Sequence, residues 1–171
     1  MKEHVLVILP HPDDESYGVA GLIALNRKKD IPVTYACATL GEMGRNMGDP
    51  FFANRETLPL LRKQELINAC KEMDINDLRM LGLRDKTLEF EDDEYLADIM
   101  EEIIDDVKPS LIVTFYPDTV CTLTMMHAGK RLSVRCTAKR KKTVRAQSAW
   151  PLPATEKRFS AKLMSYLISK K

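Results

Sequence analysis

The feature that most constrains this chain is an apolar run that leads directly into a cluster of charged residues. Residues 5–9 read VLVIL and are followed by PHPDDE at 10–15. A short, continuous aliphatic run bounded by proline predicts a strand that is buried on both faces, as in a parallel sheet. Ligands of open α/β sheets bind beyond the carboxyl ends of such strands. We therefore expect the chemistry of this protein in the loop that holds His11, Asp13 and Asp14.

The side chains of these three residues suit a divalent cation. Catalytic zinc sites combine histidine and carboxylate ligands and leave one position open for water. A neighbouring carboxylate that is not a ligand can act as a base. The alternative interpretation is that Asp13 and Asp14 cap the helix that follows, because aspartate is favoured at N-caps and in first turns.

Helix and strand patterns alternate along the first two thirds of the chain. We predict helices over 16–29, 58–73 and 93–107, and further strands over 32–39, 78–83 and 111–116. This β-α-β alternation favours an α/β fold with right-handed crossovers. The buried helix positions expected are Leu22, Ile23, Leu25, Leu61, Leu66, Ile67, Ala69 or Cys70, Leu96, Ile99, Ile103 and Ile104. The glycine-containing loop at 40–57 is expected to lie over the site.

The balance of charge changes sharply near residue 118. Residues 1–117 contain 13 Lys/Arg and 23 Asp/Glu, whereas residues 118–171 contain 13 and 2. The second segment also lacks strand alternation and a clear helical face. We predict an α/β domain over 1–117 and an irregular, poorly packed basic segment over 118–171.

The remaining composition limits the environment of the protein. The sequence shows no signal peptide, and no apolar run approaches the ~20 residues of a membrane span. We therefore expect a cytoplasmic protein that does not engage membranes. Cys37, Cys70, Cys121 and Cys136 lack CxxC spacing, so reduced thiols are expected. The oligomeric state stays open, and the sequence is compatible with a homo-oligomer.

Three motifs together resemble one known family. HPDDE at 11–15, TLGEMG at 39–44 and LRKQEL at 61–66 resemble the LmbE-like, or PIG-L, family of zinc-dependent N-acetylglucosaminyl deacetylases. The resemblance covers roughly residues 4–117 and is strongest to the bacillithiol-biosynthesis deacetylases, which remove acetyl from N-acetylglucosaminyl-malate. It implies a three-layer, Rossmann-like α/β fold with a mostly parallel sheet, and a small amino-sugar substrate.

The resemblance also implies roles for single residues. His11 and Asp14 match zinc ligands, Asp13 matches the general base, and Glu42 and Arg62 match positions near the substrate. Bound zinc lowers the pKa of water toward ~7 and polarises the acetamide carbonyl. Asp13 then takes a proton and returns it to the leaving amine. For Glu42 and Arg62 a structural interpretation is equally open, because such a glutamate can brace a loop and a helical arginine is commonly solvated.

One motif of the family is absent from the sequence as written. Family members take the third zinc ligand and an oxyanion-side histidine from an HPDH motif soon after the strand that corresponds to 111–116. This chain has no HPDH, and its other histidines, His4 and His127, lie in different contexts. A site with two protein ligands leaves zinc under-coordinated. We therefore expect little or no deacetylase activity from the chain as written.

A one-nucleotide deletion near codon 118 accounts for both the missing motif and the change in charge. Residues 117–135 can be encoded so that one added G after the proline codon yields PGYGVHPDHDACGEAVIRA. This product contains HPDHDA at the expected place. Met125, Met126 and His127 force its Asp-Ala pair whatever codons are used. We predict that the basic segment is a frameshift product.

A second class of function is a non-catalytic binding protein. In that interpretation the basic segment engages nucleic acid or another polyanion through phosphate contacts. Steep salt-dependent retention on nucleic acid without bound metal would support it, whereas zinc stoichiometry and amine release support the deacetylase, which we favour. A dinucleotide-binding domain is disfavoured because the turn after 5–9 lacks GxGxxG and holds two carboxylates where a pyrophosphate would lie.

Overall fold

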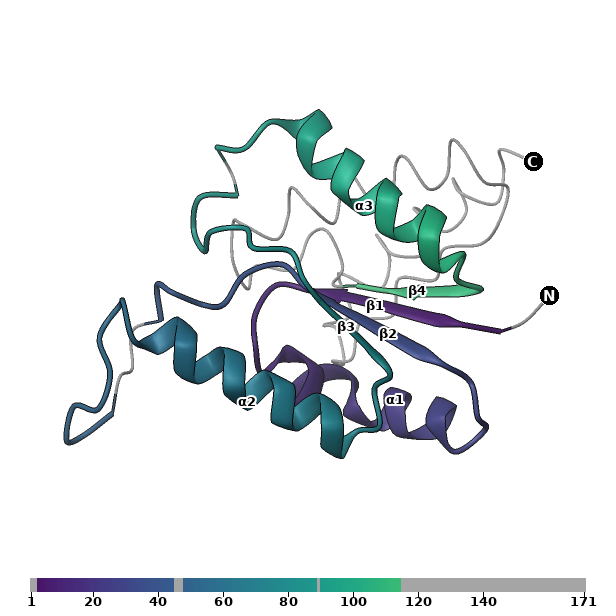
Figure 1. The fold of residues 1–171 in the computed structure, drawn as a ribbon, viewed down its shortest axis with the longest axis horizontal. Coiled ribbons are helices and arrows are strands. Elements are labelled where there is room, and N and C mark those ends of the chain that lie inside the picture. Colours follow the sequence, from purple (N-terminus) through teal and green to yellow (C-terminus); the bar gives the residue numbers. More distant parts are fainter. Residues whose placement is uncertain (1–2, 45–47, 89, 115–171) are drawn as a thin grey trace, which may run out of the picture.

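The computed structural model describes residues 3–44, 48–88 and 90–114 of the chain. Within these ranges a parallel sheet lies between two layers of helices (Figure 1). The strands are β1 (Val5–Leu9), β2 (Val33–Cys37), β3 (Asp77–Met80) and β4 (Leu111–Val113). The helices are the π-helical turn η1 (Glu15–Val19), α1 (Ala20–Arg27), α2 (Leu58–Glu72) and α3 (Asp93–Val107). The predicted frameshift and basic segment lie outside the described residues.

The sheet has the order β3-β2-β1-β4, and every neighbouring pair is parallel. Figure 1 shows α1 and α2 on one side of the sheet and α3 on the other. The predicted three-layer α/β fold with a parallel sheet is confirmed. Strands β2 and β4 pair with opposite edges of β1. The direction in which successive strands are added to the sheet therefore reverses between β1 and β4. In open α/β sheets the crevice at such a switch point is where ligands bind.

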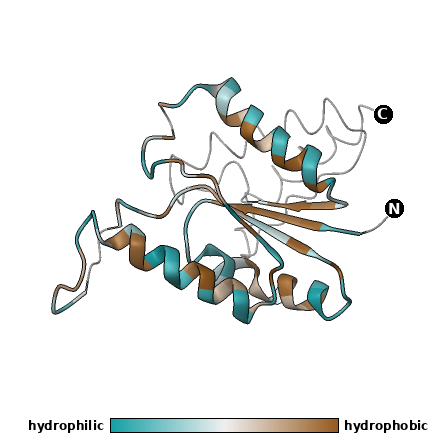
Figure 2. Ribbon diagram, in the orientation of Figure 1, coloured by the Kyte–Doolittle hydropathy of each residue, from teal (hydrophilic) through white to brown (hydrophobic). Residues whose placement is uncertain are grey.

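Strand β1 forms the centre of the core. All five of its residues are buried, and successive side chains point to opposite faces of the sheet. Val5, Val7 and Leu9 pack in one cluster with residues of α1 and α2. Leu6 and Ile8 pack in a second cluster with residues of α3. Helices on both faces therefore explain why this strand is continuously apolar, and Figure 2 shows hydrophobic β1 between helices that carry both hydrophobic and hydrophilic residues.

Helix α3 matches the predicted range of 93–107. It begins at Asp92, whose carboxylate accepts hydrogen bonds from two backbone N–H groups of the first turn. It ends at Lys108, which adopts the left-handed conformation with φ of 49°. Leu96, Ile103 and Ile104 are buried as predicted, and Ile99 packs partly buried beside them.

The other two helices correct the predicted burial. Ile23 is fully buried, but Leu25 is 64% exposed. Two residues correspond to about 200° around a helix, so Leu25 points away from the core that Ile23 contacts. In α2 the buried residues include Leu66, whereas Leu61 is 42% exposed. Five residues place Leu61 about 140° around the helix from Leu66, and the predictions for Leu25 and Leu61 are wrong.

The remaining buried positions and element boundaries differ less. Leu22, Ile67 and Ala69 are partly buried and Cys70 is buried. The helix predicted over 16–29 is divided into η1 and α1, and the strand predicted over 78–83 begins at Asp77 and ends at Met80. Strand β4 ends at Val113, and the predicted residues 115–116 lie outside the described ranges.

Two of the four cysteines lie in this core. Cys37 and Cys70 are free thiols and are buried, as predicted. Burial raises the pKa of Cys70 to about 12 and raises the pKa of Cys37 well above its usual range. Both are therefore neutral and inert near neutral pH. Among the described residues, no helix is long and apolar enough to cross a membrane.

Candidate functional site

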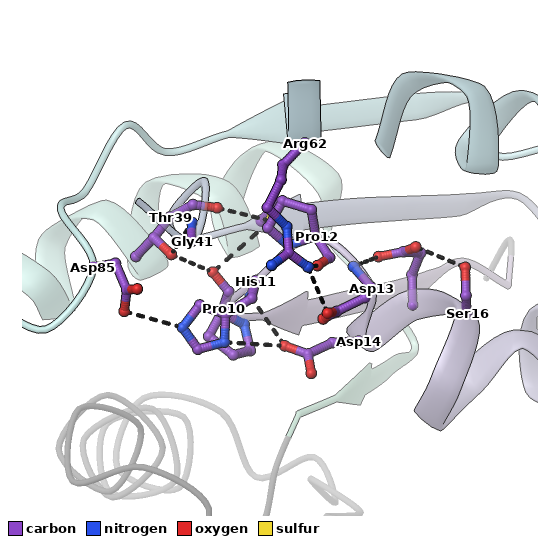
Figure 3. Close-up of polar contacts among 12 residues, drawn as sticks. Pro10, His11, Pro12, Asp13, Asp14, Ser16, Thr39, Gly41, Arg62 and Asp85 are labelled. Atoms are coloured by element: carbon purple, nitrogen blue, oxygen red, sulfur yellow. Dashed lines mark hydrogen bonds and ion pairs between the residues drawn. The ribbon is translucent and has the colours of Figure 1, made fainter. Parts of the chain in front are cut away.

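The candidate site lies in the loop that follows β1, at the carboxyl edge of the sheet (Figure 3). This loop is tied to the end of β2. The carbonyl of Pro10 accepts hydrogen bonds from the backbone N–H of Thr39 at 2.8 Å and from its hydroxyl at 2.9 Å. Parallel pairing of β1 with β2 brings the two strand ends together, so the position of His11 follows from the register of the sheet.

The ring of His11 lies between two carboxylates. Its Nδ1 is 3.7 Å from Oδ2 of Asp14, and its Nε2 is 3.2 Å from Oδ1 of Asp85. The backbone N–H of His11 donates to the same Asp14 oxygen at 3.0 Å. The side chains of His11 and Asp14 are 21% and 19% exposed, whereas that of Asp85 is only 6% exposed. The site therefore has an open side at Asp14 and a closed side at Asp85.

Asp14 is a partly desolvated carboxylate. Its pKa is raised to about 6 in total: burial is the largest cause, the hydrogen bond from His11 and the charge of that residue lower the pKa, and the charges of Asp13 and Glu15 raise it. Asp14 occupies the N-cap position of η1, but within the described chain its side chain accepts no capping hydrogen bond there. The capping interpretation is therefore wrong for Asp14, whose carboxylate is turned toward His11.

Asp13 has an unusual backbone conformation. Its φ of 114° lies outside the regions that residues with a side chain normally adopt, and such conformations cost about 1–3 kcal/mol and cluster at functional sites. Its side chain is 62% exposed and forms an ion pair with Nη2 of Arg62. The same Nη2 donates to the carbonyl of Pro12. Arg62 thus holds both the backbone and the carboxylate of this loop.

Glu15 is a buried residue that accepts hydrogen bonds from the site loop, and it was not identified from the sequence. It is 2% exposed. Its Oε2 accepts from the backbone N–H of Asp13 at 2.9 Å, and its Oε1 accepts from the hydroxyl of Ser16 at 2.7 Å. The hydroxyl of Tyr35 donates to Glu15 at 3.4 Å, and burial raises the pKa of Tyr35 well above its usual range. Because the contact with Tyr35 forms only when β2 pairs with β1, no local sequence pattern indicated Glu15.

The structure favours a site role for Arg62 and a structural role for Glu42. Arg62 is 22% exposed and points into the site rather than into solvent. Its Nε is buried and has no hydrogen-bond partner among the described residues. Glu42 accepts a hydrogen bond from the backbone N–H of Asp85 at 3.1 Å, so it braces the loop after β3. Asp85 itself, which the sequence indicated only as part of that loop, is the second site residue that sequence reasoning missed.

The loop at 40–57 contributes one further contact to the site. The backbone N–H of Met43 donates to Oδ2 of Asp85 at 3.1 Å. Gly41 has a φ of 65° and lies against the side chain of Arg62, where an added Cβ would meet the guanidinium at 3.4 Å. The expectation that this loop lies at the site is confirmed for its first residues.

The donors of His11 and Asp14 fit two ligands of a divalent metal. A tetrahedral zinc with bonds of about 2.0–2.2 Å separates neighbouring donors by roughly 3.4 Å, and Nδ1 of His11 lies 3.7 Å from Asp14. The described residues contain no group of three His, Cys, Asp or Glu side chains arranged for a metal ion. The HPDH motif that would supply a third ligand is absent from the sequence as written, and the segment after β4 where it would fall lies outside the described residues.

Together, the fold and the site define an α/β protein with a histidine and carboxylate cluster at the switch point of a parallel sheet. The family model described as PIG-L, GlcNAc-PI de-N-acetylase, matches residues 6–128. The chain belongs to this deacetylase family.

A curated relative agrees with the family match. The chain is 61% identical over 118 residues to a probable N-acetyl-alpha-D-glucosaminyl L-malate deacetylase 2 of Bacillus cereus, covering 69% of this chain and 54% of that protein. The chain thus spans about half the length of this curated relative.

Solved structures share the fold. The N,N'-diacetylchitobiose deacetylase of Pyrococcus horikoshii matches with a TM-score of 0.66 and 23% identity, over 80% of this chain and 49% of that one. GalB, a 4-carboxy-2-hydroxymuconate hydratase of Pseudomonas putida, matches with a TM-score of 0.70 and 16% identity, over 84% and 62%. Because these two names describe different reactions, the fold alone does not decide the reaction.

Proposed function

We propose that this chain carries the catalytic domain of a zinc-dependent deacetylase that removes acetyl from an N-acetylglucosaminyl conjugate such as N-acetylglucosaminyl-malate. The observation that carries the proposal is the pairing of His11 and Asp14 at the carboxyl end of β1, with Asp13 beside them in a strained backbone conformation. The likeness to the Bacillus cereus deacetylase supports the choice of substrate class.

In this proposal His11 and Asp14 hold the zinc. When bound, zinc supplies a Lewis acid that polarises the acetamide carbonyl and makes water more acidic. Asp13 is the proton carrier. Its carboxylate is exposed toward the site and oriented by Arg62, so it can take a proton from the attacking water and deliver it to the leaving nitrogen. The adjacent position of Asp13 and Asp14 separates the two tasks between neighbouring carboxylates.

Arg62 is the residue that we propose contacts the sugar conjugate. Its buried Nε has no partner among the residues that the structure describes, and buried donors are normally satisfied. A shift of the Arg62 side chain on substrate binding would let a hydroxyl or carboxylate oxygen of the substrate satisfy it. Glu42, although it also matches a substrate-side position, acts through the loop of Asp85.

The division of the chain belongs to the same proposal. Residues 1–117 form the α/β domain, and residues 118–171 are the product of a one-nucleotide deletion that removed the HPDH motif. The charge change at that position supports it. A site with two protein ligands holds zinc weakly, so the chain as written is expected to bind zinc but to release little or no amine.

The test combines zinc content with amine release from N-acetylglucosaminyl-malate. Asp14→Ala should lose zinc, whereas Asp13→Ala should keep it. The coding DNA is sequenced across codons 115–130, and a gene with one nucleotide added there is expressed beside the original. The restored protein should release amine, and its Asp13→Ala variant should not.

Three results count against the proposal. Equal zinc content in Asp13→Ala and Asp14→Ala contradicts the roles of these residues. If no single insertion opens a frame that encodes HPDHD, the frameshift is wrong. If neither protein releases amine and the chain is retained on nucleic acid with steep salt dependence, the binding protein replaces the deacetylase.

A further inference from the structure

Asp85 offers both of its carboxylate oxygens to hydrogen-bond donors. Oδ2 accepts from the backbone N–H of Met43 at 3.1 Å, and Oδ1 lies 3.2 Å from Nε2 of His11. The backbone N–H of Asp85 in turn donates to Glu42 at 3.1 Å. The residue is 5% exposed. These contacts hold the carboxylate in one orientation behind the ring of His11.

The contact between Asp85 and His11 determines which ring nitrogen carries the hydrogen. A carboxylate can only accept, so Nε2 of His11 must be the donor. In a neutral ring the other nitrogen, Nδ1, then carries the lone pair. Nδ1 is also the nitrogen that lies beside Asp14, at 3.7 Å from Oδ2. The lone pair therefore points to the open side of the site, where it can bind a metal.

We propose that Asp85 is a positioning residue that fixes His11 in the Nε2–H tautomer and reserves Nδ1 for the divalent metal. The metal part of this inference rests on the proposed function. Ligating histidines depend on such partners, because the second ring N–H must be held for the first nitrogen to be oriented. Asp85 reaches His11 from the loop that follows β3, and β3 is not adjacent to β1, since β2 lies between them.

An amide at this position could not serve both donors. In Asp85→Asn one oxygen accepts and one NH₂ donates. If the oxygen stays with the N–H of Met43, the NH₂ faces Nε2 and favours the Nδ1–H tautomer, which blocks the metal-binding nitrogen. If the amide is reversed, the NH₂ faces the N–H of Met43. Asp85→Asn thus disfavours the Nε2–H tautomer of His11 while it keeps the size of the side chain at this position.

The tautomer can be measured without metal. Protein labelled with ¹⁵N at histidine is studied by NMR about 2 pH units above the ordinary histidine pKa of ~6.5, and the His11 signals are assigned by their loss in His11→Gln. The wild-type chain should show a protonated Nε2 and an unprotonated Nδ1. A wild-type ring that is mainly Nδ1–H overturns the proposal, whatever the stability of any variant.

The metal part is tested by zinc affinity, measured by competition with a chromogenic chelator. Asp85→Asn should lose about 10–100-fold in affinity, as is typical when the partner of a ligand is changed, and should shift toward Nδ1–H in the NMR experiment. Asp77→Asn is the matched control. It makes the same chemical change at the first residue of β3, whereas Asp85 lies beyond the end of that strand. Asp77 contacts Thr34 and Arg79. The zinc affinity of Asp77→Asn should equal that of wild type.

The outcomes separate the two proposals. Equal zinc affinity in Asp85→Asn and wild type overturns the role of Asp85 and leaves the proposed function standing. Absence of zinc binding by the wild-type chain overturns the proposed function and with it the metal part of the inference. A loss of affinity in Asp77→Asn as large as that in Asp85→Asn also overturns the role, because the effect would then not be specific to the partner of His11.

Discussion

The two edges of the sheet carry similar side chains in different arrangements. At the carboxyl edge, His11 lies between Asp14 and Asp85, and Arg62 holds Asp13. At the amino edge, a chain of hydrogen bonds runs from His4 through Thr34 to Asp77, and Arg79 joins Asp77 to Asp106. Each edge thus combines a histidine, several aspartates and an arginine.

The difference lies in which charges are compensated. Arg79 forms ion pairs with both acids at the amino edge, and hydrogen bonding to Asp106 and Asp77 raises its pKa. At the carboxyl edge Asp14 has no arginine partner within the described ranges, and its pKa is raised to about 6, chiefly by burial. Asp13 adds a strained backbone. The amino edge is therefore arranged for stability, whereas the carboxyl edge keeps groups in unfavourable states, as functional sites do.

The largest predicted change in the free energy of unfolding is that of Asp14→Asn. The folded pKa of Asp14, about 6, exceeds the ordinary value of 3.8, so the folded state binds more protons and stability falls as pH rises between these values. Asp14→Asn removes this loss and should stabilise the metal-free chain at pH 7 by up to about 3 kcal/mol, at about 1.4 kcal/mol per pKa unit. Denaturant unfolding across pH 4–7 measures it.

The same experiment has an internal comparison at the amino edge. Asp77→Asn should not produce a gain that grows with pH, because Asp77 is already paired with Arg79. If the unfolding free energies of wild type and Asp14→Asn change in parallel from pH 4 to 6, the ionised Asp14 carboxylate does not destabilise the fold, and the prediction is wrong.

A smaller gain is predicted at Asp13. Glycine adopts a φ of 114° without a steric penalty. Asp13→Gly should therefore stabilise the chain by about 1 kcal/mol after the loss of the ion pair with Arg62 and the added chain entropy of glycine. Asp30, at φ of 57°, is the control, because aspartate tolerates that conformation better. Equal gains from Asp13→Gly and Asp30→Gly in thermal unfolding would remove the evidence for strain at the site.

The smallest effect is predicted at the amino edge itself. Arg79→Met should cost less than about 1 kcal/mol, because exposed ion pairs contribute little, and Asp106 is 64% exposed. The cost should shrink further in high salt. Zinc affinity should not change. A change in zinc affinity comparable with that of Asp14→Ala would show that the two edges are coupled.

The features predicted correctly from sequence are those with a strong local pattern. Strand β1 was predicted from five aliphatic residues and a proline, and α3 from Leu96, Ile103 and Ile104 at helical spacing. Exposed apolar residues produced the errors, because Leu25 and Leu61 satisfy a helical pattern as well as buried leucines do. Hydrophobicity alone does not say which stripe of a helix meets the sheet.

The sequence by itself determined the parallel α/β framework and the place of His11, Asp13 and Asp14, because strand periodicity and a polar loop after a buried strand are local properties. Only the tertiary structure decided that Asp85, 74 residues from His11, lies beside its ring. It likewise decided that Glu15 is buried under the loop. These partners depend on strand order and register, which bring distant loops to one edge of the sheet. Short-range patterns do not contain that information.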